Sequence, residues 1–412
     1  MIQTSTKTSL SFDNTANAFH YKSDKDLKQA HFLFSSMGFQ WLVDLGTRLT
    51  PWAIKRGLPV KNIVRKTIFK QFVGGETLEE TKPVVDMLAQ YNVQVILDYG
   101  VEGGDMGELG YDQSMEQFIK VIEYAGTQSN IPFMSVKVTG LARLPLLNKL
   151  DELMHRSTNT LVDRYERALE QLSAEEKVQW RRVVDRMERI CEEAAKHEVG
   201  VLIDAEETWI QDPVDALVCI MMDKYNRGRC IVYNTAQLYR HDRLAFFRNM
   251  LEAAVERGFI LGIKLVRGAY MEKERERAAE MGYPSPIQPD KQSCDADYDE
   301  AVQLSIDHLD QCSLILASHN EHSNKLAVDL LQKKGLPLDH HHVHFSQLYG
   351  MSDNITFNLA KIGCNVSKYL PFGPIDEVIP YLMRRAQENS SVGGQTGREL
   401  LLIKKELKRR GA

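Results

Sequence analysis

The chain has 412 residues, of which 43% are hydrophobic and 26% are charged, and its formal net charge is −5. A chain of this size and balance is globular and can bury one large core with an appendage, or two cores. Acidic and basic residues are interspersed, so no long basic stripe is available to a nucleic-acid backbone, and we expect no nucleic-acid partner. The six cysteines are scattered without a CxxC pair, which favours a reducing compartment.

The first 75 residues differ from the rest of the chain. A polar leader runs through Lys25, and apolar positions then recur at helical spacing from Leu27 to Phe72. The most apolar stretch, His31–Leu45, is shorter than a bilayer span and follows a long polar leader. We therefore predict a helical arm over residues 1–75, with no signal peptide and no transmembrane helix.

Short apolar or β-branched runs then alternate with longer segments of helical periodicity, which is typical of repeated βα units. Thr77 and Glu80 form a capping-box pattern that starts the helix before the first run. The eight runs are Val93–Asp98, Phe133–Thr139, Gly200–Asp204, Cys230–Asn234, Gly262–Arg267, Leu314–Ser318, Val343–Gln347 and Asn365–Leu370. The count of eight favours an α/β fold of the closed (β/α)8 TIM-barrel type over residues 76–395, rather than an open doubly wound sheet.

Two segments elaborate this pattern. The long charged connection from Leu146 to Glu198 contains two amphipathic helical stretches and is interpreted as an extended crossover. Residues 396–412 form a basic C-terminal tail, for which a solvated helix and a membrane contact both remain open.

Polar or small residues stand at the ends of most of the eight runs. In a parallel barrel these ends form one rim, where active sites of this architecture are built. The residues at or just after the run ends are Asp98, Lys137, Thr139, Asp204, Glu206, Gln237, Arg267, His319, Asn320 and Tyr369.

The last helix carries the most specific local pattern. It is expected to begin near Asp376, with Pro380 in about its first turn, where backbone N–H groups lack helical partners. Tyr381, Arg384, Arg385 and Glu388 then lie on one face, and paired guanidinium groups suit a carboxylate ligand. A solvated basic turn is the alternative for such a pair.

Lys137 lies within an apolar strand. It is interpreted as a Schiff-base nucleophile, as a charge partner for an anion or acid, or as a structural residue that reaches the rim. Asp204 has carboxylate neighbours, but their spacing matches no metal-ligand motif, and an ion pair is favoured there. The histidine cluster at residues 340–344 also lacks ligand spacing, so no metal site is predicted.

Gly268 and Ala269 follow the fifth run and precede a charged helix. They would let the backbone approach a flat or phosphate-bearing ligand, although a plain tight turn fits as well. No GxGxxG follows any strand, so the Rossmann fingerprint is absent.

Seven segments in this order resemble the proline dehydrogenase family, from about Phe72 to Ser390. They are SVKVTGL, LIDAEE, YNTAQLY, KLVRGAYMEKER, ASHNEHS, HFSQLYGM and YLPFGPIDEVIPYLMRRAQENS. The arm sequence also resembles that of the single-function bacterial members.

The resemblance implies roles position by position. Lys137, Arg384 and Arg385 would bind the substrate carboxylate. The residues that shape or support the substrate pocket, several of them assigned to catalysis, would be Asp204, Lys264, Tyr270, Leu348, Tyr369, Tyr381 and Glu388. The flavin-contacting set would be Ala205, Gln237, Lys264, Val266, Arg267, Gly268, Ala269, Lys291, Ser318, His319 and Asn320.

The activity implied is oxidation of L-proline to 1-pyrroline-5-carboxylate, the first step of proline catabolism, with hydride passed to FAD and electrons then passed to a quinone. A quinone acceptor implies peripheral membrane contact of a cytoplasmic protein, and the product would be released or handed to a separate 1-pyrroline-5-carboxylate dehydrogenase.

Three alternatives remain. In the first, hydroxyproline is the substrate in place of proline. Tyr369 argues against this alternative, because its phenol would crowd a ring hydroxyl. A Schiff-base aldolase or lyase would use Lys137. A non-catalytic barrel would bind no flavin.

Overall fold

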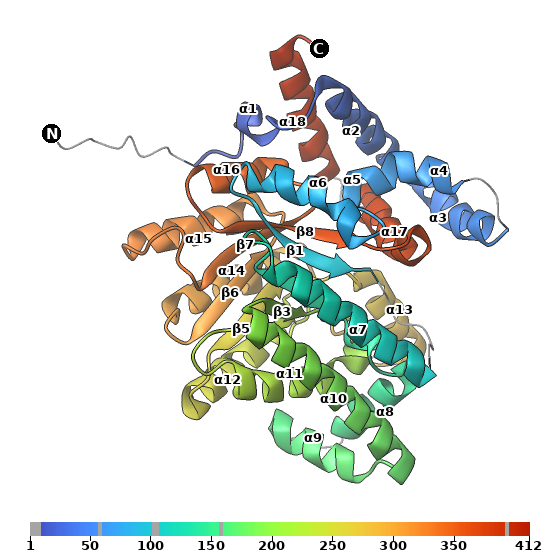
Figure 1. Ribbon diagram of the computed structural model, residues 1–412, viewed down its shortest axis with the longest axis vertical. Coiled ribbons are helices and arrows are strands. Elements are labelled where there is room, and N and C mark those ends of the chain that lie inside the picture. The colour runs from blue at the N-terminus through green and yellow to red at the C-terminus, as the bar shows by residue number, and fades with distance from the viewer. Residues whose placement is uncertain (1–9, 57–59, 101–106, 156–159, 392–394) are drawn as a thin grey trace. The chain divides into compact units, whose positions relative to one another are not determined.

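The computed structural model describes residues 10–56, 60–100, 107–155, 160–391 and 395–412 (Figure 1). Eight strands form a closed barrel in chain order, and the recorded pairings between neighbours are all parallel, which confirms the predicted (β/α)8 barrel. The strands are β1 (Gln94–Tyr99), β2 (Phe133–Val136), β3 (Gly200–Ile203), β4 (Val232–Gln237), β5 (Leu261–Val266), β6 (Cys312–Ala317), β7 (Val343–Leu348) and β8 (Val366–Phe372).

Most strand bounds differ from the sequence prediction by one or two residues, and the ends of β2 and β4 differ by three. β2 ends at Val136, not at Thr139, because Gly140 N–H donates to the carbonyl of Lys137 and winds residues 138–140 into a 3₁₀ turn, η2. β4 extends to Gln237, because residues 234–237 stay in register with β5. Apolar and β-branched composition indicates which residues form a strand. It does not indicate where the backbone stops bonding to the neighbouring strand and begins to bond within a turn.

The chain divides into two compact units, residues 1–95 with 318–412, and residues 96–317. Helices of the first unit are α1 (Thr15–Ala18), α2 (Asp24–Met37), α3 (Gln40–Lys55), α4 (Lys61–Val64), α5 (Lys70–Phe72), α6 (Leu78–Ala89), α15 (Glu321–Lys333), α16 (Asp353–Lys361), α17 (Ile375–Ser391) and α18 (Gln395–Arg410), with the π-helical turn η1 (Arg65–Phe69). Those of the second are α7 (Gly107–Gly126), α8 (Leu144–Met154), α9 (Leu161–Glu170), α10 (Ala174–His197), α11 (Gln211–Tyr225), α12 (Arg243–Arg257), α13 (Met271–Met281) and α14 (Lys291–Asp307), with the 3₁₀ turns η2 (Val138–Gly140) and η3 (Thr208–Ile210).

Within the first unit, the arm is helical as its periodicity predicts. Leu27, Phe34, Val64 and Phe72 are buried in one apolar cluster of this unit. The first nine residues of the polar leader lie outside the described part of the chain.

The turn before α6 shows half of the expected capping box. Thr77 accepts a hydrogen bond from Glu80 N–H, but the Glu80 carboxylate accepts from Glu76 N–H instead of from the cap residue. The cap itself is therefore confirmed, and the reciprocal bond is displaced by one residue.

The C-terminal tail is the helix α18, which runs beside α2 in the first unit (Figure 1, red and blue). Leu402 and Ile403 are fully buried, whereas Lys404 and Lys408 are exposed. One face of the tail therefore packs on the protein and the other carries its basic residues.

In the second unit, the connection between β2 and β3 forms α8, α9 and α10, which confirms the predicted elaborated crossover. Helix α10 begins with a complete capping box between Ser173 and Glu176. The structure records all six cysteines of the chain as free thiols, and all six are buried.

Candidate active site

Four charged side chains of the second unit alternate in sign near the carboxyl ends of β1, β2, β3 and β5. Lys137 Nζ lies 3.2 Å from Asp98 Oδ1 and 3.4 Å from Asp204 Oδ2. Lys264 Nζ donates to the other oxygen of Asp204. Asp98, Lys137 and Lys264 are buried, and burial of charge is tolerated in proteins when each group is paired. The predicted ion pair at Asp204 is therefore present, and it joins three residues that the sequence singled out.

Asp98 was not among the expected site residues, although it was noted as a polar residue at a strand end. Its Oδ1 also accepts a hydrogen bond of 2.7 Å from Ser135 Oγ on the neighbouring strand. Residues Asp98 and Ser135 are register partners of β1 and β2. The pairing of β1 with β2 therefore positions the Asp98 carboxylate, and this carboxylate in turn positions Lys137.

Glu206 is a second buried carboxylate beside this set. Thr139 Oγ1 lies 3.0 and 2.8 Å from its two oxygens, and Glu206 N–H donates to Gln211 Oε1 at 3.1 Å. Burial raises the pKa of Glu206 to about 7, against the lowering effects of Thr139 and the Lys137 charge. The carboxyl therefore changes charge near neutral pH.

The segment after β5 exposes backbone. Gly268 has φ of +132°, and a Cβ there would lie 2.4 Å from the ring of Tyr239, so only glycine fits. Gly268 and Ala269 are exposed, and Val266 and Arg267 just before them are half-buried; Tyr270 follows at the start of α13.

Two further pairs of predicted cofactor residues are brought together in this unit. Gln237 Nε2 donates to the carbonyl of Ala205 at 3.3 Å. Arg267 and Lys291 both bind the carboxylate of Asp295, with Arg267 at 2.7 Å. The Arg267 guanidinium also lies 4.2 Å from the Tyr298 ring centre, which orients its donors.

Within the first unit, helix α17 carries the arginine pair. Arg385 is buried, its guanidinium lies 5.2 Å from the Tyr381 ring centre, and it donates to Glu388 at 2.5 Å. The Nε of Arg385 is buried without a hydrogen-bond partner among the described residues. Arg384 is half-buried. A buried, unsatisfied guanidinium donor is costly, and an anionic ligand would satisfy it.

Pro380 lies elsewhere in this helix than the sequence indicated. Helix α17 begins at Ile375, so Pro380 is its sixth residue and belongs to the second turn. The prediction of a first-turn proline is therefore wrong by about one turn, because Glu377 N–H and Val378 N–H already bond to the carbonyl of Pro374.

Other expected residues of the first unit lie just after β6, at the end of β7 and within β8. Asn320 caps α15 by accepting from His322 N–H and Ser323 N–H, and Ser318 Oγ accepts from Asn320 N–H. Leu348 and Tyr369 are register partners of β7 and β8. These strand pairings place the two candidate pocket residues side by side.

A buried ion cluster next to His319 was missed by the sequence reasoning. His319 Nδ1 lies 2.9 Å from Ser352 Oγ, and Ser352 N–H donates to Glu399 of α18 at 3.1 Å. Burial and the nearby Asp353 charge raise the pKa of Glu399 to about 7. Asp353 itself is paired with Lys368 at 2.9 Å. No sequence motif marks this cluster, because its members are spread over the turn before α15, β8, the start of α16 and α18.

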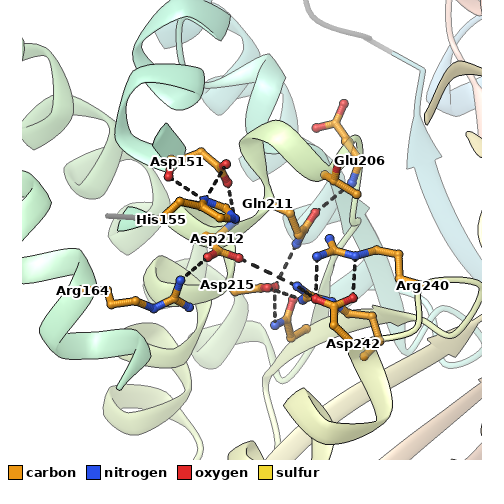
Figure 2. Close-up of polar contacts among 12 residues, drawn as sticks. Asp151, His155, Arg164, Glu206, Gln211, Asp212, Asp215, Arg240 and Asp242 are labelled. Carbon is orange, nitrogen blue, oxygen red and sulfur yellow. Dashed lines mark hydrogen bonds and ion pairs between the residues drawn. The ribbon is translucent and has the colours of Figure 1, made fainter. Parts of the chain in front are cut away.

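One group in the described residues has the geometry to hold a metal ion, with ligand atoms of Asp151, His155 and Asp212 within 4.8 Å of one another. Figure 2 shows that these groups already have protein partners, His155 with Asp151 and Asp212 with Arg164. The Arg164–Asp212 ion pair measures 2.7 Å. Hydrogen bonding to Asp151 raises the pKa of His155 to about 9. A protonated imidazole between two carboxylates accounts for the cluster without a cation.

Comparison with known proteins matches residues 82–398 to the family described as proline dehydrogenase. The chain is 32% identical to the hydroxyproline dehydrogenase of Xenopus laevis over 97% of this chain and 90% of that protein. It is 31% identical to proline dehydrogenase 1 of Arabidopsis thaliana, over 97% and 86% respectively.

Among solved structures, proline utilization A from Bdellovibrio bacteriovorus matches with a TM-score of 0.69 at 19% identity, covering 94% of this chain and 40% of that one. This likeness supports the barrel fold. The family match extends over most of the chain and over all eight barrel strands from end to end, and the chain therefore belongs to the proline dehydrogenase family.

Proposed function

We propose that this protein is an FAD-dependent proline dehydrogenase that oxidises L-proline to 1-pyrroline-5-carboxylate. The observation that carries the proposal is the buried guanidinium of Arg385, whose Nε has no acceptor among the described residues. Family membership supplies the reaction class, and the arginine pair supplies a ligand type, the carboxylate of an amino acid.

Arg384 and Arg385 hold the proline carboxylate in this proposal, and Glu388 and Tyr381 fix the orientation of Arg385. Lys137 is assigned to the same carboxylate. Tyr369, Leu348 and Tyr270 shape the pocket, while Asp204 orients Lys137 and Lys264 through their ion pairs.

The residues after β5 fit a flat cofactor with polar edges. The bare backbone at Gly268 permits close approach, and the side chains of Lys264, Gln237 and Arg267 supply donors beside it. The assigned flavin set is Ala205, Gln237, Lys264, Val266, Arg267, Gly268, Ala269, Lys291, Ser318, His319 and Asn320. When bound, FAD supplies the oxidant that accepts a hydride equivalent from the substrate.

The substrate amine must be neutral for its lone pair to assist loss of hydride from the adjacent carbon. Cationic groups disfavour a second positive charge nearby, so Lys137 and the arginines lower the pKa of the bound amine. The protein therefore contributes orientation and electrostatics, and it also controls the proton on the substrate nitrogen.

The electron acceptor in this proposal is a membrane quinone, reached by peripheral contact of a cytoplasmic protein with the inner face of the membrane. Among the described residues, no helix is both long and apolar enough to cross a bilayer. The product leaves for a separate 1-pyrroline-5-carboxylate dehydrogenase.

Hydroxyproline is the second candidate substrate, because a relative named hydroxyproline dehydrogenase is about as similar as those named proline dehydrogenase. Tyr369 favours proline, since its phenol would crowd a ring hydroxyl. A comparison of kcat/KM for the two substrates decides between them, and a higher value for hydroxyproline would reverse the assignment.

The central test is spectroscopic. Purified protein should be yellow, with a flavin spectrum that bleaches under anaerobic conditions on addition of L-proline. Protein that takes up FAD but does not bleach with proline or hydroxyproline would overturn the proposed reaction. Mass increase on borohydride treatment with a carbonyl substrate would instead support the Schiff-base alternative at Lys137.

A further inference from the structure

The helical arm differs in charge from the rest of the molecule. Residues 22–72 contain ten Lys and Arg but only three Asp and no Glu, whereas the whole chain has a net charge of −5. A segment of 51 residues with a local charge of +7 attracts anionic surfaces that the remainder of the chain repels.

Part of this charge surrounds a cleft of about 700 Å³ between α2, the segment formed by η1 and α5, and the loop that follows β7. We call it the lysine cleft; its cationic lining residues are Lys22, Lys25, Lys28, Lys66 and Lys70. Lys22 is paired with Asp353 and Lys70 with Asp26. The structure records no ion pair for Lys25, Lys28 or Lys66 among the residues it describes, and all three are exposed.

Helices of the same arm also expose large apolar side chains. We call these the apolar ridge, which consists of Phe32, Phe39, Trp41, Leu45, Leu49 and Ile63. Phe32 is 72% exposed, Trp41 64% and Ile63 65%. Phe32 also lines the lysine cleft, so the apolar ridge and the lysine cleft meet at this residue.

Helix α3 shows why the apolar ridge is not a by-product of core packing. Val43 is buried in the apolar cluster of this unit, whereas Trp41, Leu45 and Leu49 recur every four residues on a different, exposed face. A helix at the surface of a globular protein normally presents polar residues on the face away from the core. Helix α3 instead presents a second apolar face.

We propose that the lysine cleft and the apolar ridge together dock this protein on an anionic phospholipid bilayer. The lysines bind lipid phosphates, and the ridge inserts its aromatic and leucine side chains at the level of the headgroups, where Trp is favoured. An apolar face or a basic patch alone gives weak attachment, and the combination gives stable peripheral binding.

A second copy of the chain suits this surface less well. Two arms brought face to face would oppose two local charges of +7, which is unfavourable without anions between them. This inference rests on the proposed function in one respect, because a membrane quinone as electron acceptor explains why the enzyme needs a bilayer. Binding to the bilayer itself requires no catalytic turnover.

The test uses purified holoenzyme and sedimented vesicles, without proline or quinone. We expect co-sedimentation with vesicles of phosphatidylcholine and phosphatidylglycerol in equal amounts, and little with phosphatidylcholine alone. Binding should weaken as salt rises, because salt screens the lysine charges. Equal binding to both kinds of vesicle, or no binding to either, would overturn the proposal.

Two double variants locate the surface. Lys25→Gln/Lys28→Gln should weaken binding to the anionic vesicles at least about tenfold. The matched control is Lys404→Gln/Lys408→Gln on the exposed face of α18, which removes the same charge from the other basic helix and should change binding little. An equal loss in the control would show that net charge, not the lysine cleft, determines binding, and would overturn the assignment.

A third variant tests the apolar ridge and the rival occupant. Trp41→Ser/Leu45→Ser should weaken vesicle binding and leave the oligomeric state in solution unchanged. If it instead converts a dimer to a monomer without affecting vesicle binding, the ridge is a subunit interface and the proposal fails.

Activity with a soluble dye separates this proposal from the proposed function. Each of the three double variants should oxidise proline with the dye as the unmodified enzyme does, since their residues lie outside the candidate active site. An enzyme that reduces dye but ignores vesicles overturns the docking surface alone. A protein that binds vesicles but does not oxidise proline overturns the proposed function alone.

Discussion

Arg385 donates to Glu388 one turn further along α17, at 2.5 Å, and this contact leaves the Nε of the same guanidinium without an acceptor in the described chain. The carboxylate of Glu388 thus orients the group without saturating it. A guanidinium group whose hydrogen-bond donors are only partly satisfied is suited to bind the carboxylate of a ligand.

The substitution Arg385→Met tests this role. Losing a charged hydrogen-bonding group should raise KM for proline about a hundredfold, corresponding to roughly 3 kcal/mol, with FAD content unchanged. Steady-state kinetics and the flavin-to-protein absorbance ratio measure the two effects. Gln387→Met, at an exposed position of the same helix, is the control and should alter neither. Loss of flavin in the Arg385 variant would place the residue at the cofactor.

The Lys137–Asp98 pair is open to a double-mutant cycle. Lys137→Met leaves the buried Asp98 carboxylate with Ser135 as its one partner among the described residues, and should lower the free energy of unfolding by roughly 3 kcal/mol. Lys137→Met/Asp98→Leu should recover much of that loss, because no charge is stranded. Denaturant unfolding measures both. The exposed pair Lys82–Asp86 serves as comparison, where Lys82→Met should cost less than about 1 kcal/mol. A similar cost at both pairs would contradict the burial argument.

Glu206 predicts a pH dependence of stability. Folding raises the pKa of this carboxyl from 4.5 to about 7, so the folded state favours the protonated form. The contribution of this carboxyl to folding stability is therefore fully present below about pH 4.5. It is lost as pH rises through about 7, and the free energy of unfolding falls by roughly 3 kcal/mol over this range.

Unfolding free energies at pH 5 and pH 8 should therefore differ less in Glu206→Gln than in the unmodified protein. Thr139→Val removes hydrogen bonds that favour the ionised form and should move the decline to higher pH. An unchanged pH slope in Glu206→Gln would mean that the carboxyl is not the titrating group.

Gly268 predicts a steric effect on cofactor binding. Gly268→Ala places a methyl group 2.4 Å from the Tyr239 ring at a backbone conformation that other residues rarely adopt, so the segment after β5 must shift. We expect reduced FAD content in the purified variant, measured by absorbance. Gly282→Ala also has positive φ but meets no atom within 4 Å, and it should keep its flavin. Equal loss of FAD in both variants would indicate that backbone strain, and not the contact of the new methyl group with Tyr239, causes the loss.

The barrel could be predicted because each of the eight strands is a short apolar run bounded by helical periodicity. Strand ends were less accurate, as at β2, where the residues after Val136 remain β-branched in composition while their hydrogen bonds turn into η2. The pairing of Arg385 with Tyr381 and Glu388 followed from helical spacing alone.

The ion pairs between distant residues could not be predicted in the same way. Asp98 and Lys137 are 39 positions apart, and the charges of Asp353 on α16 and Glu399 on α18 interact within the first unit. No local pattern encodes such pairings, because they depend on strand register and helix packing. The functional roles of the assigned residues stay predictions.

The burial of all six cysteines has a practical consequence. Burial raises the pKa of Cys219 and Cys294 to about 11 and that of Cys191 further still, so these thiols stay protonated and shielded at neutral pH. A cysteine introduced at Lys25 or Lys404 would then be the one thiol open to a maleimide dye. Each position offers a single-site optical probe for observing which face of the molecule approaches lipid, with no need to remove the native thiols.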